Sequence, residues 1–185
     1  MTGPTIEQFC GRNFFLSNMC PLKNWIVSDT DLRVPTTEHV YQAAKFADPE
    51  LRLHVARAKN GLDAKRLAHT YEMSGAKLID NWQVAKFGIM RVALWRKYTE
   101  NKDMRDMLLA TGDAHLVEGN DWGDEVWGVC PVGSNNGENY LGLLHEEVRQ
   151  RIRTHPEDFE GRGEYSDGFS LGSLVLIKYQ TLETS

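Results

Sequence analysis

The residues from Pro35 to Lys45 combine polar side chains at a spacing that could support catalysis. A proline followed by a hydroxyl residue such as Thr36 commonly opens a helix, because the side-chain oxygen caps the first free amides. At about 3.6 residues per turn, four polar side chains fall on one face of this helix: Glu38, Tyr41, Gln42 and Lys45. Glu38 and Lys45 then lie roughly 10 Å apart along the axis, within reach of one substrate. The alternative, which the pattern alone favours, is a surface helix whose polar face is merely solvated.

Length and composition indicate a single globular domain. The chain has 185 residues, which is long enough to bury a core. Its residues are 41% hydrophobic and 25% charged, as is usual for a globular protein. The net charge of -5 argues against a general binder of phosphate backbones, but not against an enzyme that reaches one nucleotide. Cys10, Cys20 and Cys130 show no CxxC spacing, so we expect free thiols in a reducing compartment. Because the N-terminus lacks a secretory pattern and no apolar run approaches about 20 residues, we expect a cytoplasmic or nuclear protein.

The elements around the Pro35 helix are predicted to be mostly helical. A hairpin over residues 25–34 leads into that helix, and residues 1–14 look loosely structured. Asp48-Pro49-Glu50 opens the next helix with an Asp cap and a proline at its first position. Asn60-Gly61 ends that helix and begins a short one, followed by an irregular connection over residues 71–80.

The longest predicted helix begins at Asn81 and runs to about Tyr98. It carries two apolar stripes, so we place it at the centre of the fold. Its solvent-exposed edge is predicted to comprise Gln83, Lys86 and Lys97. Asn101 is expected to cap a further helix, and Gly112 stands where a left-handed residue would end it.

A loop rich in glycine, acids and tryptophan lies between two predicted strand fragments, Leu116-Val117 and residues 126–129. Trp122 and Trp127, flanked by glycines, suit an aromatic wall with an open approach, as base stacking requires. The alternative is that both indoles are core residues. The polar loop 133–137 leads into a last helix over residues 139–153, where free amides could hold an anion. It matches neither GxGxxG nor the P-loop pattern, so no nucleotide-binding fingerprint applies.

Other chemistries receive little support from the sequence. The six histidines form no HExxH pair and lie beside no cysteine, so no zinc site is predicted. No GxSxG elbow is present. Beyond residue 155 the chain becomes acidic and glycine-rich, and Leu174-Val175-Leu176-Ile177 then reads as a strand. Because such an apolar strand would aggregate if exposed, we expect residues 171–180 to dock on the main domain or on a partner.

Several of these stretches also occur together in a fixed order. They are FLSN at 15–18, PTTEHVYQAAK at 35–45, Trp82, LLATGDAHLVE at 108–118, residues 124–128 and GENYLG at 137–142. This set resembles the NADAR family, also called YbiA-like, over about residues 9–153. The resemblance and the patterns predict an α+β fold, predominantly helical, in one domain with a few short strands. We expect a catalytic domain over residues 1–154, and a C-terminal extension over 155–185 made of a glycine-rich link and a docking strand.

The resemblance implies an N-glycosidase that hydrolyses the bond between ribose C1 and a nitrogen of a base. One implied substrate is ADP-ribose attached to guanine in nucleic acid or nucleotides, and another is a phosphoribosylamino-pyrimidine intermediate of riboflavin synthesis. We favour ADP-ribosyl-guanine, because a domain with two loop tryptophans and no riboflavin-pathway domain fits the reversal of base modification. A module that binds ADP-ribose without hydrolysing it is the alternative from another class.

The resemblance assigns catalysis to Glu38 and Lys45. Breaking a ribosyl C–N bond builds positive charge on the sugar, which a carboxylate such as Glu38 can stabilise, or it can activate water. Lys45 either holds a phosphate or the leaving base, or attacks the opened sugar to form a Schiff base, which requires a neutral amine. We favour the Schiff-base route.

The remaining predicted site residues are substrate-binding. They are Arg12, Ser17, Asn18, Tyr41, Gln42, Trp82, Trp122, Asp124, Trp127, Gly137, Asn139, Tyr140 and Gly142. The tryptophans are expected to stack on adenine or guanine, and Asp124 to accept hydrogen bonds from guanine or ribose. Arg12, Ser17, Asn18 and the 137–142 segment are expected at the diphosphate and ribose. We expect no cofactor, no metal and no membrane partner; the expected partner is an ADP-ribose-containing substrate, including ADP-ribosylated DNA or RNA.

Overall fold

The computed structural model describes residues 3–27 and 33–159. Their helices are α1 (Thr37–Ala44), α2 (Pro49–Ala56), α3 (Gly61–Met73), α4 (Trp82–Glu100), α5 (Lys102–Ala110) and α6 (Tyr140–Thr154), with 3-10 turns η1 (Gly11–Leu16) and η2 (Pro156–Phe159). Their strands are β1 (Thr5–Ile6), β2 (Ile26–Val27), β3 (Arg33–Val34) and β4 (His115–Leu116). The predicted class, mostly helical with a few short strands, is confirmed.

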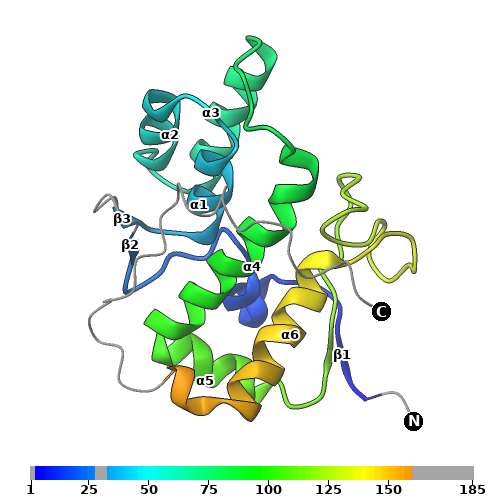
Figure 1. Ribbon diagram of the computed structural model, residues 1–185. Helices are drawn as coiled ribbons and strands as arrows, with labels where there is room; N and C mark the ends of the chain where they lie inside the picture. The colour runs from blue at the N-terminus through cyan, green and yellow to red at the C-terminus, as the bar shows by residue number, and fades with distance from the viewer. Residues whose placement is uncertain (1–2, 28–32, 160–185) are drawn as a thin grey trace, which may run out of the picture.

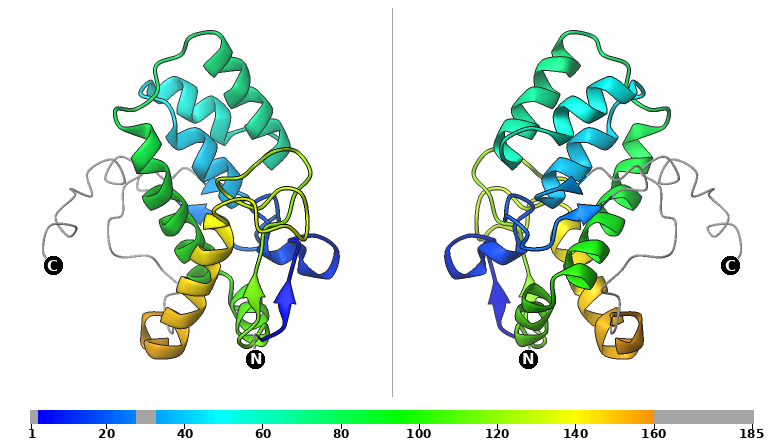
Figure 2. Two further views of the ribbon diagram at one scale, coloured as in Figure 1. Left: turned by 90° about the vertical axis from the view of Figure 1, so that its right-hand side faces the viewer. Right: turned by 90° about the vertical axis from the view of Figure 1, so that its left-hand side faces the viewer.

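Helix α4 runs through the middle of the molecule (Figure 1). It packs against α1 on one side and against α5 and α6 on the other. The views in Figure 2 place α1–α3 at one end of the molecule and α5, α6 and η2 at the other. Ile89, Leu94 and Tyr98 belong to the two predicted apolar stripes and are almost completely buried, as expected for a central helix.

The strands form two small pairs. Ile26 pairs with Val34 in the predicted hairpin, whose turn lies outside the described residues. Thr5 pairs with His115 in a parallel ladder, so the expectation that residues 1–14 are loosely structured was wrong. The second predicted strand fragment, 126–129, is also not a strand, since it contributes one isolated bridge, between Gly119 and Val129.

Capping side chains explain where several helices begin. Thr36 accepts a hydrogen bond from the backbone N–H of His39, as predicted. Asp48 caps α2, and Asn60 accepts from Asp63 N and thereby begins α3. Helix α3 extends to Met73, so the irregular connection predicted to start at residue 71 is shorter than expected.

Two predicted caps act differently. Asn81 precedes α4 with a positive φ of 58° and makes no side-chain capping bond. Asn101 instead accepts a hydrogen bond from Asn24 N at 2.8 Å and so ties α4 to the β2 segment. Gly112 has a φ of +57°, as its predicted left-handed position requires.

Lys97 is fully buried, and its predicted place on the exposed edge of α4 was wrong. Its Nζ donates to the backbone carbonyl of Ser17 at 3.0 Å. Burial lowers the pKa of the Lys97 amine to about 8, because the charged form loses its hydration. The periodicity of α4 could not reveal this, since the segment that covers Lys97 comes from a distant part of the sequence.

The described chain ends where Phe159 stacks on Trp95, with 4.4 Å between the ring centroids. The docking strand predicted over 171–180, and nearly all of the 155–185 extension, lie outside the described residues. Their docking therefore stays a prediction.

Candidate active site

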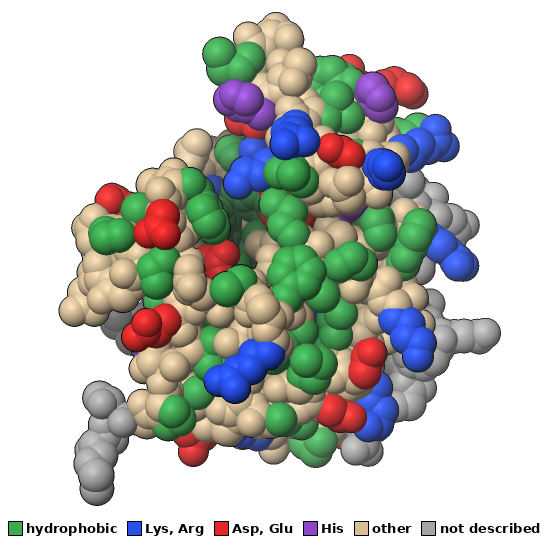
Figure 3. All heavy atoms as spheres, turned by 180° about the vertical axis from the view of Figure 1, so that it is seen from behind, with side chains coloured by type: hydrophobic (Ala, Val, Ile, Leu, Met, Phe, Trp, Pro, Cys, Tyr) green, Lys and Arg blue, Asp and Glu red, His purple; other side chains and the backbone are tan. Residues whose placement is uncertain are grey.

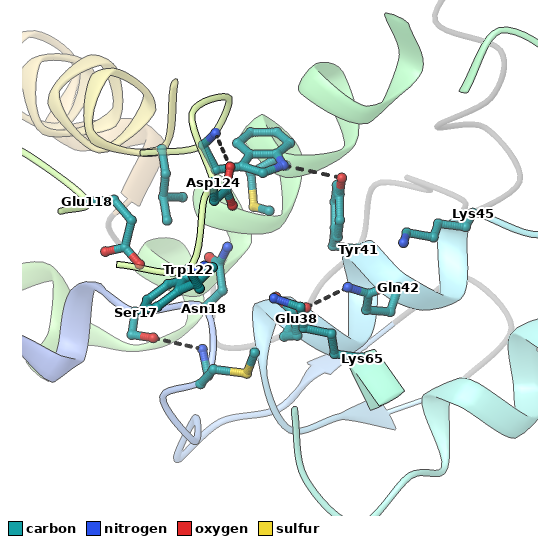
Figure 4. Close-up of a pocket in the computed structure, with 14 residues that line it drawn as sticks. Ser17, Asn18, Glu38, Tyr41, Gln42, Lys45, Lys65, Glu118, Trp122 and Asp124 are labelled. Carbon is teal, nitrogen blue, oxygen red and sulfur yellow. Dashed lines mark hydrogen bonds between the residues drawn. The ribbon is translucent and has the colours of Figure 1, made fainter. Parts of the chain in front are cut away.

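A cavity of about 340 Å³ lies between α1, the Ser17–Met19 turn, α3 and the loop that follows β4. Its lining residues are Ser17, Asn18, Met19, Glu38, Tyr41, Gln42, Lys45, Lys65, Met90, Glu118, Trp122, Asp124, Trp127 and Leu141. Figure 3 shows the surface hollowed between that loop and the end of the molecule formed by α1–α3. The labelled side chains converge from both walls in Figure 4. Nine of the predicted site residues therefore share one cavity.

Helix α1 is buried on every side rather than solvated on its polar face. Glu38 is 6% exposed and Gln42 3% exposed, because α2, α3 and α4 all pack around this short helix. Gly61 permits the approach of α3, since a Cβ there would lie 3.3 Å from Glu38 Cβ and 2.9 Å from Met19 Sδ. The polar face therefore meets a cavity, not bulk water.

Glu38 is held by its neighbour one turn along the helix. Gln42 Nε2 donates to Glu38 Oε1 at 2.6 Å. Burial raises the pKa of the Glu38 carboxyl, while the Gln42 hydrogen bond and the nearby Lys65 and Lys45 lower it. A carboxyl whose proton affinity is raised in this way is suited to give and take a proton.

Lys45 lies at the C-terminal end of α1 and is paired with Glu72 of α3. Its Nζ is 2.6 Å from Glu72 Oε1. The same amine lies over the rings of Tyr41 and Trp82, at 5.7 and 5.9 Å from their centroids. Glu72 was not predicted as a site residue, because the sequence indicated that α3 ended before it.

Aromatic side chains form one wall. Trp127 Nε1 donates to the Tyr41 hydroxyl at 3.3 Å, and the two rings are edge-on with centroids 5.4 Å apart. Burial raises the pKa of Tyr41, so its hydroxyl stays protonated at neutral pH. Trp122, by contrast, is 67% exposed and lines the cavity, so one indole face is available to a ligand.

The loop after β4 is shaped by its own hydrogen bonds. Asn120 is fully buried, and its side chain bonds the backbone of Asp124 at both N–H and C=O. Asp124 Oδ1 in turn accepts from the backbone N–H of Trp127 at 2.9 Å. These bonds hold Asp124 and Trp127 at the cavity.

Glu118 is the carboxylate that the sequence-based assignment did not include. Its backbone N–H donates to Asn139 Oδ1 at 3.0 Å, and its carbonyl accepts from Val129 N. Burial, and then the charge of Asp124, raise the pKa of Glu118 to about 7. The only signal for it was its place in the LVE stretch after β4.

Six predicted substrate-binding residues do not line the cavity. Trp82 is 7% exposed and packs behind Tyr41, with ring centroids 5.2 Å apart. Arg12 is exposed on η1. Tyr140 packs on Phe87 at 4.6 Å. Trp82 and Tyr140 therefore support the aromatic wall of the cavity from behind.

The other three members of that group, Gly137, Asn139 and Gly142, position the loop after β4. Asn139 Nδ2 donates to Leu116 O at 2.8 Å, and a Cβ at Gly142 would lie 1.9 Å from the same carbonyl oxygen. Gly137 has a φ of +132° and lies against Gly128. The start of α6 thus fixes the end of β4 and the segment after it that carries Glu118, instead of presenting free amides to an anion.

Lys65 and Glu118 are the charged lining residues that sequence reasoning missed. Lys65 was assigned to the outer face of its helix, and it is exposed, yet it reaches the mouth of the cavity. Among the described residues no three His, Cys, Asp or Glu side chains are grouped to hold a metal ion. Nor does any helix in the described part of the chain have the length and apolar character needed to cross a membrane.

Comparison with known proteins gives this cavity a family context. The NADAR domain profile matches residues 8–153. This chain belongs to the NADAR family. The boundaries agree with the 9–153 resemblance found in the sequence.

Similar proteins carry two kinds of name, N-glycosidase and riboflavin biosynthesis protein. N-glycosidase YbiA of Escherichia coli (strain K12) is 36% identical over 118 residues, which are 64% of this chain and 70% of that protein. Riboflavin biosynthesis protein VVA0006 of Vibrio vulnificus (strain YJ016) is 32% identical over 141 residues, 76% of this chain but 36% of that protein. The NMR structure of the E. coli protein YbiA matches with a TM-score of 0.70 at 28% identity, over 89% of this chain and 94% of that one. The name of the E. coli relative supports N-glycosidase activity as the class for this NADAR domain, and the name of the Vibrio relative points to riboflavin synthesis.

Proposed function

We propose that this protein is an N-glycosidase that removes ADP-ribose from guanine bases in nucleic acid or nucleotides. One observation carries the proposal: Glu38 and Lys45 project from α1 into one cavity with aromatic side chains on its wall and at its mouth. A carboxylate can stabilise the charge that cleavage of a ribosyl C–N bond builds on the sugar, an amine can act as a nucleophile, and aromatic rings suit a base. The names of the relatives support the class of reaction, not this substrate.

The direct route uses Glu38 and water. As the C1–N bond breaks, positive charge develops on the sugar, and the Glu38 carboxylate stabilises it at close range. A water molecule then adds to C1 and loses a proton, while the base nitrogen leaves with one. Gln42 keeps Glu38 oriented through its 2.6 Å hydrogen bond.

The route we favour uses Lys45 as a nucleophile. Its ammonium first loses a proton, for which Glu72, 2.6 Å away, is the nearest acceptor. The sugar ring opens when its C1–O bond breaks, as the base nitrogen forms a C=N bond to C1 and Glu38 gives its proton to the ring oxygen. The neutral amine then adds to C1, Glu38 passes one of the amine's protons to the base nitrogen, and the C1–N bond to the base breaks, which leaves a protonated imine on Lys45. Water hydrolyses the imine to a free sugar aldehyde and restores the lysine.

The mouth of the cavity supports a ligand larger than a nucleoside. Trp122 is 67% exposed there, and Lys65 offers an exposed ammonium to a phosphate. A diphosphate chain can extend past these side chains while the ribosyl bond stays at Glu38. The second candidate, a phosphoribosylamino-pyrimidine of riboflavin synthesis, is favoured by the name of the Vibrio relative.

A paired substrate assay tests the proposal. The protein is incubated with an ADP-ribosylated guanosine oligonucleotide and, separately, with the riboflavin intermediate, and the released sugar is measured. Release of ADP-ribose supports the proposal, and release only from the pyrimidine supports the second candidate. Tight ADP-ribose binding without release from either substrate would show a binding module instead.

Variants separate the roles of the two residues. Glu38→Gln should lower kcat by at least about 100-fold, with Glu50→Gln, an exposed acid at the start of α2, as matched control. Borohydride added during turnover should leave a covalent adduct on Lys45, absent in Lys45→Ala and present in the exposed control Lys77→Ala. Full activity of Lys45→Ala would rule out the Schiff-base route.

A further inference from the structure

Two buried acceptors at the cavity have no hydrogen-bond partner. Among the described residues, three buried side-chain oxygens are unpaired: Gln42 Oε1, Glu100 Oε1 and Glu118 Oε2. Gln42 and Glu118 line the cavity, while Glu100 does not. Because an unpaired buried acceptor costs free energy, such atoms in a binding cavity indicate a ligand that brings N–H or O–H donors.

The two acceptors belong to opposite walls. Gln42 lies on α1 beside Glu38, where the sugar must sit for its C1 atom to react. Glu118 lies on the other wall, after β4, on the side of Trp122 and Ser17 in Figure 4. A base attached to C1 therefore extends toward Glu118.

We propose that Glu118 is the specificity-determining residue of a base subsite, and that its carboxylate binds a base edge carrying two adjacent N–H donors. The inference rests on the proposed function, because it requires a base as the leaving group. An ionised carboxylate offers two acceptor oxygens with about four lone-pair sites and no donor, so the Glu118 carboxylate can accept from two base donors besides the Phe9 N–H. A ring N–H beside an exocyclic amino group matches it, as guanine and 2-amino-pyrimidinones present.

Other bases match this carboxylate less well. Adenine sets a ring-nitrogen lone pair against one carboxylate oxygen, and hypoxanthine lacks the amino group and offers a single donor. Trp122, with its largely exposed indole, supplies a surface on which the flat base can stack while its edge points to Glu118. The subsite therefore selects the amino-lactam chemistry that both candidate substrates share.

Hydrogen bonds to the backbone of Glu118 hold its carboxylate in place before a base binds. Its N–H donates to Asn139 Oδ1 and its carbonyl accepts from Val129 N, so these two hydrogen bonds hold the backbone in place. Asn139 is itself locked to Leu116 O, against which Gly142 packs. A carboxylate held this way is placed before the ligand arrives, which limits the entropy lost on binding.

Binding of nucleoside monophosphates to the full chain tests this inference directly. Guanosine monophosphate and inosine monophosphate differ only in the amino group, and calorimetry gives both affinities. We expect the wild type to prefer the guanosine ligand by about tenfold or more, which corresponds to about 1.4 kcal/mol. In Glu118→Gln the preference should fall below about threefold, whereas Glu138→Gln, an exposed acid before α6, should keep it.

A second measurement needs no variant. The groups that face Glu118 are Asp124, Lys65, Lys97 and the backbone N–H of Phe9. Because burial raises the pKa of Glu118 to about 7, lowering the pH from 8 to 5.5 should protonate it and reduce the wild-type preference toward one. The phosphate groups of the two ligands titrate alike and cancel in the ratio.

The outcomes separate this inference from the proposed function. Equal affinities for the two ligands, no binding of guanosine monophosphate, or a wild-type preference kept by Glu118→Gln would overturn the base subsite. If no N-glycosyl substrate is cleaved but the preference is present and Glu118-dependent, the proposed function fails and the subsite stands. Isocytosine against pyrimidinone, run in parallel, shows whether a single ring carrying the same donor edge suffices.

Discussion

Replacing Glu118 by glutamine should make the protein more stable at alkaline pH, although it removes a group from the cavity. Burial and Asp124 raise the pKa of the Glu118 carboxyl from 4.5 to about 7. At about 1.4 kcal/mol per pKa unit, the ionised side chain costs the folded state about 3 kcal/mol relative to the unfolded chain. Glutamine has nearly the same shape and carries no charge.

The sign of the effect follows from proton binding. Because the folded state binds the Glu118 proton more tightly than the unfolded chain, the cost is absent below about pH 4.5 and fully present above about pH 7. The gain in the free energy of unfolding for Glu118→Gln should therefore be about 3 kcal/mol at pH 8 and less than about 1 kcal/mol at pH 5. Burial also raises the pKa of Glu100 to about 7, but Glu100 is present in both proteins and cancels.

Urea unfolding followed by tryptophan fluorescence measures this difference. Wild type, Glu118→Gln and the exposed control Glu138→Gln are compared at pH 5 and pH 8. The control should change the free energy of unfolding by less than about 0.5 kcal/mol at either pH. If the free energy of unfolding of Glu118→Gln rises equally at both pH values, or falls at pH 8, the reasoning that the ionised Glu118 side chain destabilises the folded state is refuted.

Three further predictions concern the elements around the cavity. Gly142→Ala should lower the free energy of unfolding by about 3 kcal/mol or more, because the new Cβ would lie 1.9 Å from Leu116 O. The control Gly88→Ala, which adds a Cβ into open space on α4, should raise the free energy of unfolding by up to about 1 kcal/mol in the same urea assay. Trp122→Ala should raise KM about tenfold and leave the melting temperature unchanged, since the indole is 67% exposed; an unchanged KM would exclude stacking. Lys65→Met should raise KM for phosphate-bearing substrates and weaken the dependence of KM on salt, and an unchanged salt dependence would contradict a phosphate contact.

How far the sequence alone could lead is clearest at α1. Its cap at Thr36 and its spacing predicted both the helix and the shared face of Glu38, Tyr41 and Gln42. Periodicity cannot say what covers a face, and on pattern alone this one was expected to be solvated. Burial came from α2, α3 and α4, which pack around a helix of 8 residues and turn its polar face into a cavity wall.

The groups missed in the sequence share one cause. Glu72 and Glu118 reach the site because α3 and the segment after β4 return to it from other parts of the chain. Lys97 was misplaced for the same reason, since Ser17, 80 positions away, covers it. Local propensity carries no information about such pairings.

Capping residues, left-handed glycines, apolar stripes and the family motifs are properties of short stretches. The sequence by itself therefore determined most of the helices and the family, and it predicted Glu38 and Lys45 as a pair. Which polar groups lose water, and therefore which carboxyls hold protons near pH 7, was decided only by the tertiary structure. The reason is that desolvation depends on every atom packed nearby, whatever its distance along the chain.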